Sequence, residues 1–328
     1  MKAFEYATPK SAQQAVGLLG NNWSDAELLA GGTDLLALMK DDIISPRRLV
    51  NVKQITGLDS ISYNARAGLR IGALVRIADF ADHADVRKYY PTLARVTDDA
   101  ASPQIRNLAT MAGNLCQRPR CWYFRNGFGL LGRQNGKSLV TAGDNRYHAI
   151  LGNDGPAYFV SPSSIAPALI AGGARVKIHG PNGDREVPLD RFFVIPKSES
   201  EREHDLRPNE MIVEITVPPP SGARTAQYEV RQKAEFDWPL ATASVALAMD
   251  GNKVRNAMIV LGHVAPVPWI SNEARQALVG QPLNEQTAAA AASAAVRPAK
   301  NLGKNGYKIR LTEVAIKRAI LRAAKNSG

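Results

Sequence analysis

The sequence is poor in the features by which several protein classes are first recognised. Only two cysteines, Cys116 and Cys121, occur among 328 residues. Two thiols cannot alone complete a four-ligand zinc or iron–sulfur site. Three interpretations stay open for them: free buried thiols, an internal disulfide, or part of a metal site shared with another chain.

Long apolar runs are also lacking. No stretch reaches the roughly 18 to 20 consecutive apolar residues that cross a bilayer, and residues 1–14 lack the apolar core of a secretory signal. We therefore expect no membrane span and a cytoplasmic location. Export to the periplasm stays open as an alternative, because a partner with its own signal can carry a subunit across.

Negative charge is scarce, since the net charge is +11 and the isoelectric point is about 9.7. The basic residues are scattered, with short clusters at 46–48, 118–120 and 317–318. No zinc finger, long basic run or aromatic RNA-binding signature accompanies them. This distribution favours docking to an acidic protein subunit over binding of nucleic acid.

What is present, at 45% hydrophobic residues, is enough for two or three packed domains. Apolar spacing predicts strands at 3–6, 27–30, 48–51, 69–71, 174–178, 227–231, 241–249 and 256–262. It predicts helices at 11–19, 35–39, 77–96 with an interruption at Pro91, 163–171, 272–279, 287–296 and 311–324. The triple proline 218–220 indicates a domain boundary, and the Gly- and Asn-rich segment 126–156 indicates a surface insertion rather than a core element.

Two loops carry residues that suit a phosphate. Gly31, Gly32 and Thr33 follow a predicted strand directly, and Thr110, Gly113 and Asn114 form a second loop, although an ordinary tight turn is the alternative for the first. Glycines let successive backbone N–H groups approach an anion. Neither loop is a Walker or a Rossmann motif. Two such loops fit a pyrophosphate held from both sides.

The sequences AGGTD (30–34) and SPQIRNLATMAGN (102–114) resemble the two FAD loops of the flavoprotein subunits of the xanthine dehydrogenase and carbon monoxide dehydrogenase family of molybdenum hydroxylases. The resemblance continues at 71–73, 192–193, 208–212, 264–268 and 307–308. It implies an α+β fold with a two-subdomain FAD-binding unit of the vanillyl-alcohol oxidase (PCMH) type and a C-terminal α+β domain of the CO dehydrogenase flavoprotein type. The implied limits are 1–58, 59–220 with an inserted loop at about 116–156, and 221–328.

Residues 120–125 and 145–152 further resemble the periplasmic aldehyde oxidoreductase flavoproteins, whose inserted loop binds a [4Fe–4S] cluster. Cys121 matches one ligand of that branch, but no cysteine lies between Phe124 and His148. We therefore expect no metal in this chain. Arg133, Lys137 and Arg146 are then expected to act as polar supports of the loop.

Carried over residue by residue, the resemblance implies a set of FAD contacts and no catalytic side chain. The set is Leu28, Leu29, Ala30, Gly31, Gly32, Thr33, Asp34, Ala101, Ser102, Gln104, Thr110, Gly113, Asn114, Ser164, Arg231, Lys233 and Trp238.

Two positions depart from the family pattern. Ser164 stands where a family aspartate bonds the flavin side, and Glu229 stands where the family often has a lysine. Arg231 or Lys233 could supply the cation instead, and the alternatives for both are solvated strand charges or subunit contacts.

Two aromatic residues and a histidine near this region have alternative interpretations. Trp238 and Phe236 could cover the ring, while a core role is the alternative, favoured for Phe236. His263, at a strand end, is expected to be structural.

The resemblance implies an oxidoreductase subunit for electron transfer. It would take electrons from [2Fe–2S] clusters in a small subunit, which receive them from a molybdopterin cofactor in a large subunit, and pass them from FAD to an external acceptor. We expect a heterotrimer or its dimer, of the aldehyde or xanthine dehydrogenase type. The alternatives are a stand-alone FAD oxidase and a FAD-free assembly or interaction subunit.

Overall fold

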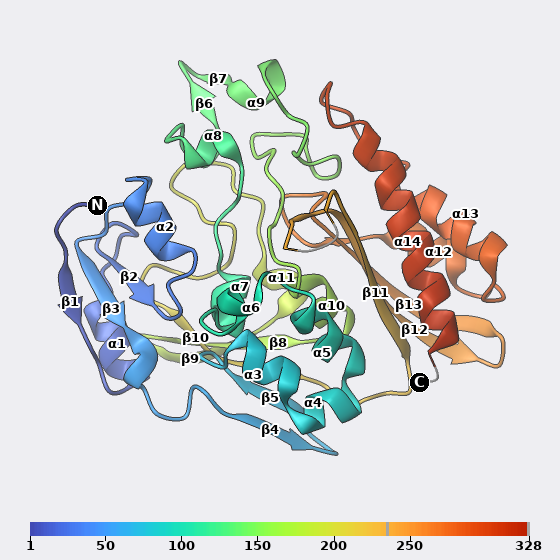
Figure 1. The fold of residues 1–328 in the computed structure, drawn as a ribbon, viewed down its shortest axis with the longest axis horizontal. Helices are drawn as coiled ribbons and strands as arrows, with labels where there is room; N and C mark the ends of the chain where they lie inside the picture. Colours follow the sequence, from blue (N-terminus) through green and yellow to red (C-terminus); the bar gives the residue numbers. More distant parts are fainter. Residues whose placement is uncertain (234–235, 327–328) are drawn as a thin grey trace.

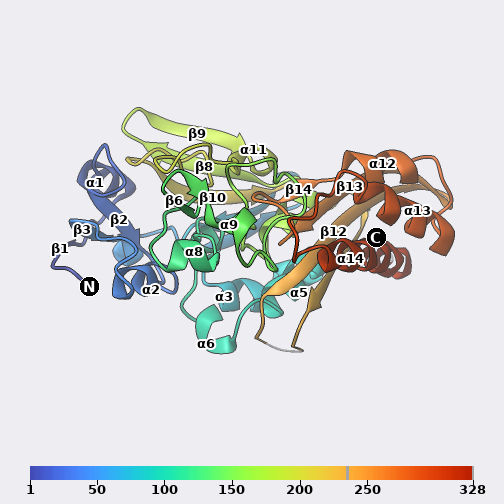
Figure 2. The ribbon, with the colours of Figure 1, turned by 90° about the horizontal axis from the view of Figure 1, so that it is seen from above.

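The computed structural model describes residues 1–233 and 236–326. Within these residues, three sheets of three to five strands follow one another along the chain, each with its own helices, as Figures 1 and 2 show, and a two-stranded hairpin makes a fourth. The sheets lie within the predicted ranges 1–58, 59–220 and 221–328. The limits themselves stay a prediction. In the described part of the chain, no helix is long and apolar enough to cross a membrane.

The N-terminal unit is a small parallel sheet in the order β1-β3-β2. Its elements are β1 (Glu5–Ala7), α1 (Ala12–Leu18), β2 (Ala26–Leu29), α2 (Leu35–Lys40), β3 (Arg48–Asn51) and η1 (Val52–Gln54). The side chain of Ser11 accepts a hydrogen bond from the Gln14 backbone N–H and so begins α1, as the sequence predicts. Strand β2 pairs in parallel with β3, and the glycine loop follows directly at the carboxyl end of β2.

The middle unit is built on an antiparallel sheet in the order β4-β5-β10-β8-β9. Its strands are β4 (Ile61–Asn64), β5 (Gly68–Gly72), β8 (Arg175–Gly180), β9 (Gly183–Pro188) and β10 (Met211–Val217). Its main helices are α3 (Ile77–Asp82), α4 (Ala84–Tyr89), α5 (Pro91–Asp98), α10 (Ala166–Ala171) and α11 (Leu189–Phe192). The predicted helical run 77–96 is broken at His83 as well as before Pro91, because His83 has an extended backbone.

Short elements fill the segment between α5 and α10. They are α6 (Pro103–Arg106), α7 (Met111–Leu115), α8 (Trp122–Arg125), β6 (Arg133–Gln134), β7 (Lys137–Ser138) and α9 (Leu139–Ala142). The expectation that 126–156 contains no core element is wrong. Leu130 and Leu131 are buried with Phe124 in a small apolar cluster, and Ile150 and Leu151 join the core of the C-terminal unit. These apolar residues are few but adjacent, so a low average hydrophobicity conceals them.

The C-terminal unit is an antiparallel sheet in the order β11-β12-β13-β14. Its elements are β11 (Arg224–Arg231), β12 (Pro239–Asp250), β13 (Lys253–Gly262), β14 (Trp269–Ile270), α12 (Asn272–Leu278), α13 (Glu285–Ala295) and α14 (Tyr307–Lys325). These helices cover one face of the sheet, while α10 of the middle unit packs on β12 and β13 (Figure 1). Helix α14 begins four residues before its predicted start.

Candidate functional site

A cleft of about 480 Å³ lies where the three units meet. Its walls come from the end of β2 and the loop after it, from residues 100–118, and from the connection between β11 and β12. Cofactor sites are commonly concave and of this order of size. Segments that are far apart in the sequence therefore form one site.

The cleft brings together most of the residues that the sequence analysis singled out. They are Leu28, Ala30, Gly31, Gly32, Thr33, Asp34, Ala101, Ser102, Thr110, Gly113, Asn114, Ser164, Arg231 and Trp238. Leu29, Gln104 and Lys233 do not line it. Gln104 and Lys233 are exposed to solvent, and Lys233 lines a different cleft.

The two glycine loops press directly against each other. A Cβ atom on Gly31 would lie 2.0 Å from the backbone oxygen of Leu108, and Gly32 has a φ of 71° that disfavours other residues. In the second loop, the Thr110 hydroxyl accepts a hydrogen bond of 3.1 Å from the Gly113 N–H and caps α7. The loops thus form a narrow cradle that side chains would fill.

Asp34 has a structural role that its motif did not reveal. Its carboxylate oxygens lie 2.8 Å from nitrogens of Arg120 and Arg125, and the Arg118 backbone N–H donates to it at 2.7 Å. The carboxylate thus binds the first loop to residues 118–125. The arginines of this segment line or support the cleft, and sequence reasoning did not include them in the site.

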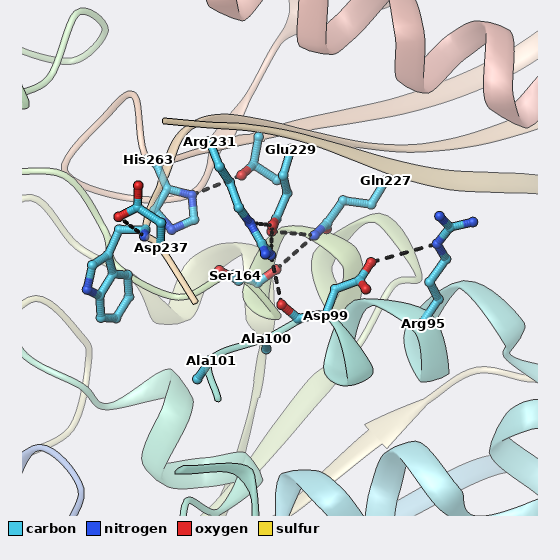
Figure 3. A network of polar contacts seen from close by, with 12 residues as sticks. Arg95, Asp99, Ala100, Ala101, Ser164, Gln227, Glu229, Arg231, Asp237 and His263 are labelled. Atoms are coloured by element: carbon cyan, nitrogen blue, oxygen red, sulfur yellow. Dashed lines mark hydrogen bonds and ion pairs between the residues drawn. The ribbon is translucent and has the colours of Figure 1, made fainter. Parts of the chain in front are cut away.

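At the C-terminal end of the cleft, Arg231 is held by a polar network (Figure 3). It forms an ion pair with Glu229, and its guanidinium donates to the Asp99 carbonyl at 2.8 Å. Gln227 donates to Glu229 at 3.0 Å and to the Ser164 carbonyl at 3.3 Å. Burial raises the pKa of Glu229, while Arg231 opposes that shift.

Ser164 and Asn114 occupy neighbouring positions in the cleft wall. Ser164 is buried, and the adjacent Ser163 hydroxyl donates to the Asn114 side-chain oxygen at 2.6 Å. This contact orients the amide of Asn114 with its nitrogen available to a ligand, because its oxygen is already engaged. The Pro-Ser-Ser sequence therefore supports the second loop from behind.

Two aromatic side chains stand at the mouth of the same end. Phe236 is 63% exposed and Trp238 is 45% exposed, and both line the cleft. The Arg120 guanidinium lies over the Trp238 ring, 4.8 Å from its centroid. A core role for either residue, which was favoured for Phe236, is wrong, because the connection after β11 carries both side chains outward.

The opposite end of the cleft was missed by sequence reasoning. Arg202 pairs with Glu27 at 2.9 Å and lies over the Trp23 ring at 4.3 Å from its centroid. Burial first, and then the nearby Glu203 and Asp34, raise the pKa of Glu27 to about 7, against the effect of Arg118. Arg202 and Glu27 are 175 positions apart in the chain, so no local sequence motif indicates the pair.

His204 belongs to this end as well. It is 9% exposed, and its Nδ1 atom is buried without a hydrogen-bond partner among the described residues. Burial and the charge of Arg118 hold its pKa at about 3, so the imidazole is neutral. The imidazole lines the cleft, although its Nδ1 atom is not accessible from it.

Comparisons with known proteins decide the family. Residues 2–220 match the family model described as FAD binding domain in molybdopterin dehydrogenase, and residues 226–323 match CO dehydrogenase flavoprotein C-terminal domain. The chain belongs to this family of molybdenum hydroxylase FAD-binding subunits. The predicted fold class, with its FAD-binding unit and C-terminal flavoprotein domain, is confirmed.

Relatives in this flavoprotein family are similar over most of their length. The aldehyde oxidoreductase FAD-binding subunit PaoB of Escherichia coli is 37% identical over 82% of this chain and 84% of its own. The carbon monoxide dehydrogenase medium chain of Hydrogenophaga pseudoflava is 32% identical over 97% and 96%. A solved structure of carbon monoxide dehydrogenase from that organism, lacking the Mo-pyranopterin moiety, aligns with a TM-score of 0.77 and 30% identity over 100% of this chain and 99% of that one.

The cleft fits the cofactor of this flavoprotein family. The cradle at Gly31, which a Cβ would fill, leaves backbone for a diphosphate, and Trp23 and the neutral side chain of His204 line one end. The other end offers the two aromatic side chains and Arg231. A long ligand with a charged centre and a ring at each end matches these three parts.

His263 is structural, as expected. Its ring nitrogens lie 3.0 Å from the Thr242 hydroxyl and 3.3 Å from the Pro162 carbonyl. Burial, followed by the charge of Lys308, lowers its pKa to about 3. Neutral and fully engaged, it cannot serve as a proton donor near neutral pH.

Both cysteines are free thiols, so the disulfide interpretation is wrong. Burial raises the pKa of Cys116, which lines the cleft, to about 12. Cys121 Sγ lies 3.1 Å from His148 Nε2 in the inserted segment. Within residues 1–233 and 236–326, no group of three His, Cys, Asp or Glu side chains is placed to hold a metal ion.

Of the three residues expected to support the inserted segment, Arg146 does so, whereas Arg133 and Lys137 do not. Arg146 pairs with Asp144 at 2.6 Å, and its carbonyl accepts from the Tyr307 hydroxyl, so it connects the segment to α14. Arg133 and Lys137 lie on the β6–β7 hairpin and are exposed. Among the described residues, neither takes part in an ion pair. Support comes from asparagines instead: Asn145 donates to the Leu302 carbonyl at 2.6 Å.

Proposed function

We propose that this chain binds the FAD from which electrons leave a heterotrimeric molybdenum hydroxylase, or a dimer of such heterotrimers. A small subunit with [2Fe–2S] clusters and a large subunit with the molybdopterin cofactor complete the complex, and an external acceptor receives the electrons. The observation that carries the proposal is the single cleft in which both glycine loops meet Arg231 and Trp238. FAD bound there would supply a store for two electrons that enter singly and leave to the acceptor.

Within that cleft, each group of residues has its own task. The backbone at Gly31 and Gly32 holds the diphosphate, because glycines leave its N–H groups uncovered by side chains. The Gly113 N–H donates to the Thr110 hydroxyl and shapes the second loop. Ser164 and Asn114 contact the chain between diphosphate and flavin. Trp238 covers the redox-active ring and excludes water from one side. No side chain is required as an acid or base, because the chain transfers electrons.

Arg231 is the cation that we assign to the flavin. It lines the cleft, whereas Lys233 does not. Glu229 and the Asp99 carbonyl fix the guanidinium in place, which lowers the reorganisation needed when charge develops on the ring. Arg231 therefore stabilises the reduced, anionic form electrostatically and raises the flavin potential.

At the far end, Trp23 and His204 are proposed to receive the base of the dinucleotide. The neutral imidazole of His204 and the Trp23 ring supply aromatic surface there, which suits the packing of a base. Glu27, Arg202 and Arg118 surround this end with buried charge, and they position the loop at 202–206 against β2.

Aldehydes are the proposed substrate class of the whole complex, supported by the similarity to PaoB over most of both chains. The substrate pocket would lie in the molybdenum subunit. We place the complex in the cytoplasm, with the periplasm as the alternative if a partner carries an export signal. Cell fractionation distinguishes these locations.

The test is purification of the native complex with its visible spectrum, metal content and subunit composition. We expect flavin absorbance in this chain together with molybdenum and [2Fe–2S] iron in two further subunits, and aldehyde-dependent bleaching of the flavin. Flavin without partner subunits would indicate a stand-alone oxidase. A colourless chain would indicate an assembly or interaction subunit and would overturn the proposal.

A further inference from the structure

A second cleft, of about 1290 Å³, lies along β11. Helices α5 and α14 stand on either side of that strand (Figure 1), and the triple proline 218–220 closes one end. We call this cleft the β11 groove. Arg231 lines both the groove and the flavin cleft, so the two meet at this residue.

Positive charge dominates the β11 groove. Its basic residues are Arg95, Arg231, Lys233, Arg318, Arg322 and Lys325. Its two carboxylates are already engaged, since Glu229 pairs with Arg231 and Asp99 lies 3.7 Å from Arg95. Four cations are left, and among residues 1–233 and 236–326 none of them forms an ion pair.

Local structure explains only part of this charge. Arg322 and Lys325 stand in the last turn of α14, where cations favour the helix dipole. Arg318 and Arg322 also lie over the Tyr228 ring, at 5.1 and 5.0 Å from its centroid. The dipole argument also covers Arg95, which stands in the last turn of α5 and pairs with Asp99. Neither reason applies to Lys233, which lines another wall of the groove.

The groove wall restricts how a polypeptide could bind. The outward carbonyl of Thr225 accepts from Thr92 at 3.1 Å and from Asn326 at 2.8 Å, and that of Gln227 accepts from Arg322 at 2.7 Å. These contacts block the first half of the β11 edge against an added strand. An occupant must therefore be held by the basic side chains.

We propose that the β11 groove receives an acidic, extended segment of a partner subunit, which ends beside Arg231 at the flavin cleft. This proposal rests on the proposed function for the existence of such partners. A strand of eight residues is roughly 26 Å long, enough for a peptide segment to contact all four free cations. Single-stranded nucleic acid fits less well, because arginines already cover the Tyr228 ring that a base would stack on.

The test reverses two groove charges in the assembled complex. Arg318→Glu with Lys325→Glu is compared with Arg255→Glu with Arg275→Glu, which changes the same charge at exposed positions of the same domain outside the groove. The readout is the NaCl concentration at which this chain separates from its partners in size exclusion. We expect about ten-fold weaker association for the groove variant, and so separation at a lower NaCl concentration, because two ion pairs are lost and charge reversal adds repulsion.

Retention of flavin by the separated groove variant shows that it is folded. Equal salt resistance of groove variant and control would overturn the proposal. So would a wild-type complex whose absorbance at 260 nm reveals nucleic acid that only the groove variant loses. A wild-type preparation without partner subunits would instead contradict the proposed function itself.

A photoreactive amino acid in place of Arg318 gives an independent readout in the same complex. An adduct with an acidic peptide of a partner subunit is expected. If neither the probe in place of Arg318 nor the probe in place of Arg255 gives an adduct with a partner subunit, the groove is open to solvent. That result would overturn the proposal.

Discussion

Arg231 and Lys233 are two residues apart, yet only one of them reaches the flavin cleft. The sequence left both open as the cation near the flavin, because both follow the same strand pattern. The distinction depends on the ion pair with Glu229 and on the Asp99 carbonyl, which belong to segments 130 residues apart. Glu229 departs from the family pattern, and its ion pair with Arg231 explains why a carboxylate stands at this position.

Arg231→Gln should lower the two-electron midpoint potential of the bound flavin. Loss of a nearby cation destabilises the anionic reduced form, and a shift on the order of 30 mV corresponds to about 1.4 kcal/mol for a two-electron couple. Spectroelectrochemistry of the purified chain measures it. Lys233→Gln is the matched control and should leave the potential unchanged. An equal shift in both variants would contradict the assignment.

Because Glu229 loses its partner in that variant, Arg231→Gln with Glu229→Gln is needed as well. The double variant should still have a lowered potential, because the lost cation lines the flavin cleft whereas the lost carboxylate of Glu229 does not. Recovery of the wild-type potential would mean that the pair acts only as a neutral support.

Glu27 predicts a pH dependence of stability. Its folded-state pKa of about 7 lies above the unfolded value of 4.5, so the folded chain binds more protons between these values. Stability should therefore be greatest below about pH 4.5 for this group and fall as pH rises through 7. The full difference is up to about 3 kcal/mol.

Chemical denaturation between pH 5 and 8 checks this expectation. Glu27→Gln should flatten the decline, because it removes the titrating group and keeps the side-chain shape. A variant with the same pH slope as the wild type would show that Glu27 stays ionised with Arg202 throughout.

At the scale of elements, the sequence predicted the N-terminal strand–helix–strand order and the C-terminal sheet with its helices. It did not predict β4, β9 or β10. Strand β10 is largely buried but stands between a segment of charged residues and the triple proline, and β9 is mostly polar, so neither gives a clear alternation. The inserted segment was misjudged because its burial depends on partners in the C-terminal unit.

Lys308 illustrates that dependence. Its ammonium donates to the carbonyls of His263 at 2.7 Å and of Tyr147 and His148 at 3.2 Å, so it connects β13, α14 and the inserted segment. Burial lowers its pKa to about 7. Lys308→Met should cost roughly 2–4 kcal/mol of unfolding free energy, because buried carbonyls lose their donor.

Denaturant unfolding with both circular dichroism and fluorescence measures this loss. The exposed Lys304 is the control, and Lys304→Met should change stability by less than about 0.5 kcal/mol. A Lys308→Met variant as stable as the wild type would mean that water replaces the ammonium at these carbonyls.

At the scale of the whole molecule, the two loops identified from the sequence become one site only when three units meet. The sequence could indicate the glycine loops, because their chemistry is local. It could not indicate Trp23, Arg202 or His204, which reach the same cleft from separate units. The site is thus a property of the assembly of units, and its glycine cradle is the part on which FAD binding most depends.

The most direct test of this account is the FAD affinity of the chain with Gly31→Ala, compared with the wild type and with Gly17→Ala. A Cβ at Gly31 would collide with the Leu108 carbonyl, whereas Gly17 has open space around it. We predict a single tightly bound FAD in wild type and Gly17→Ala, and at least about ten-fold weaker binding in Gly31→Ala, or about 1.4 kcal/mol. Equal affinity in all three chains, or no FAD binding by the wild type, would contradict the account.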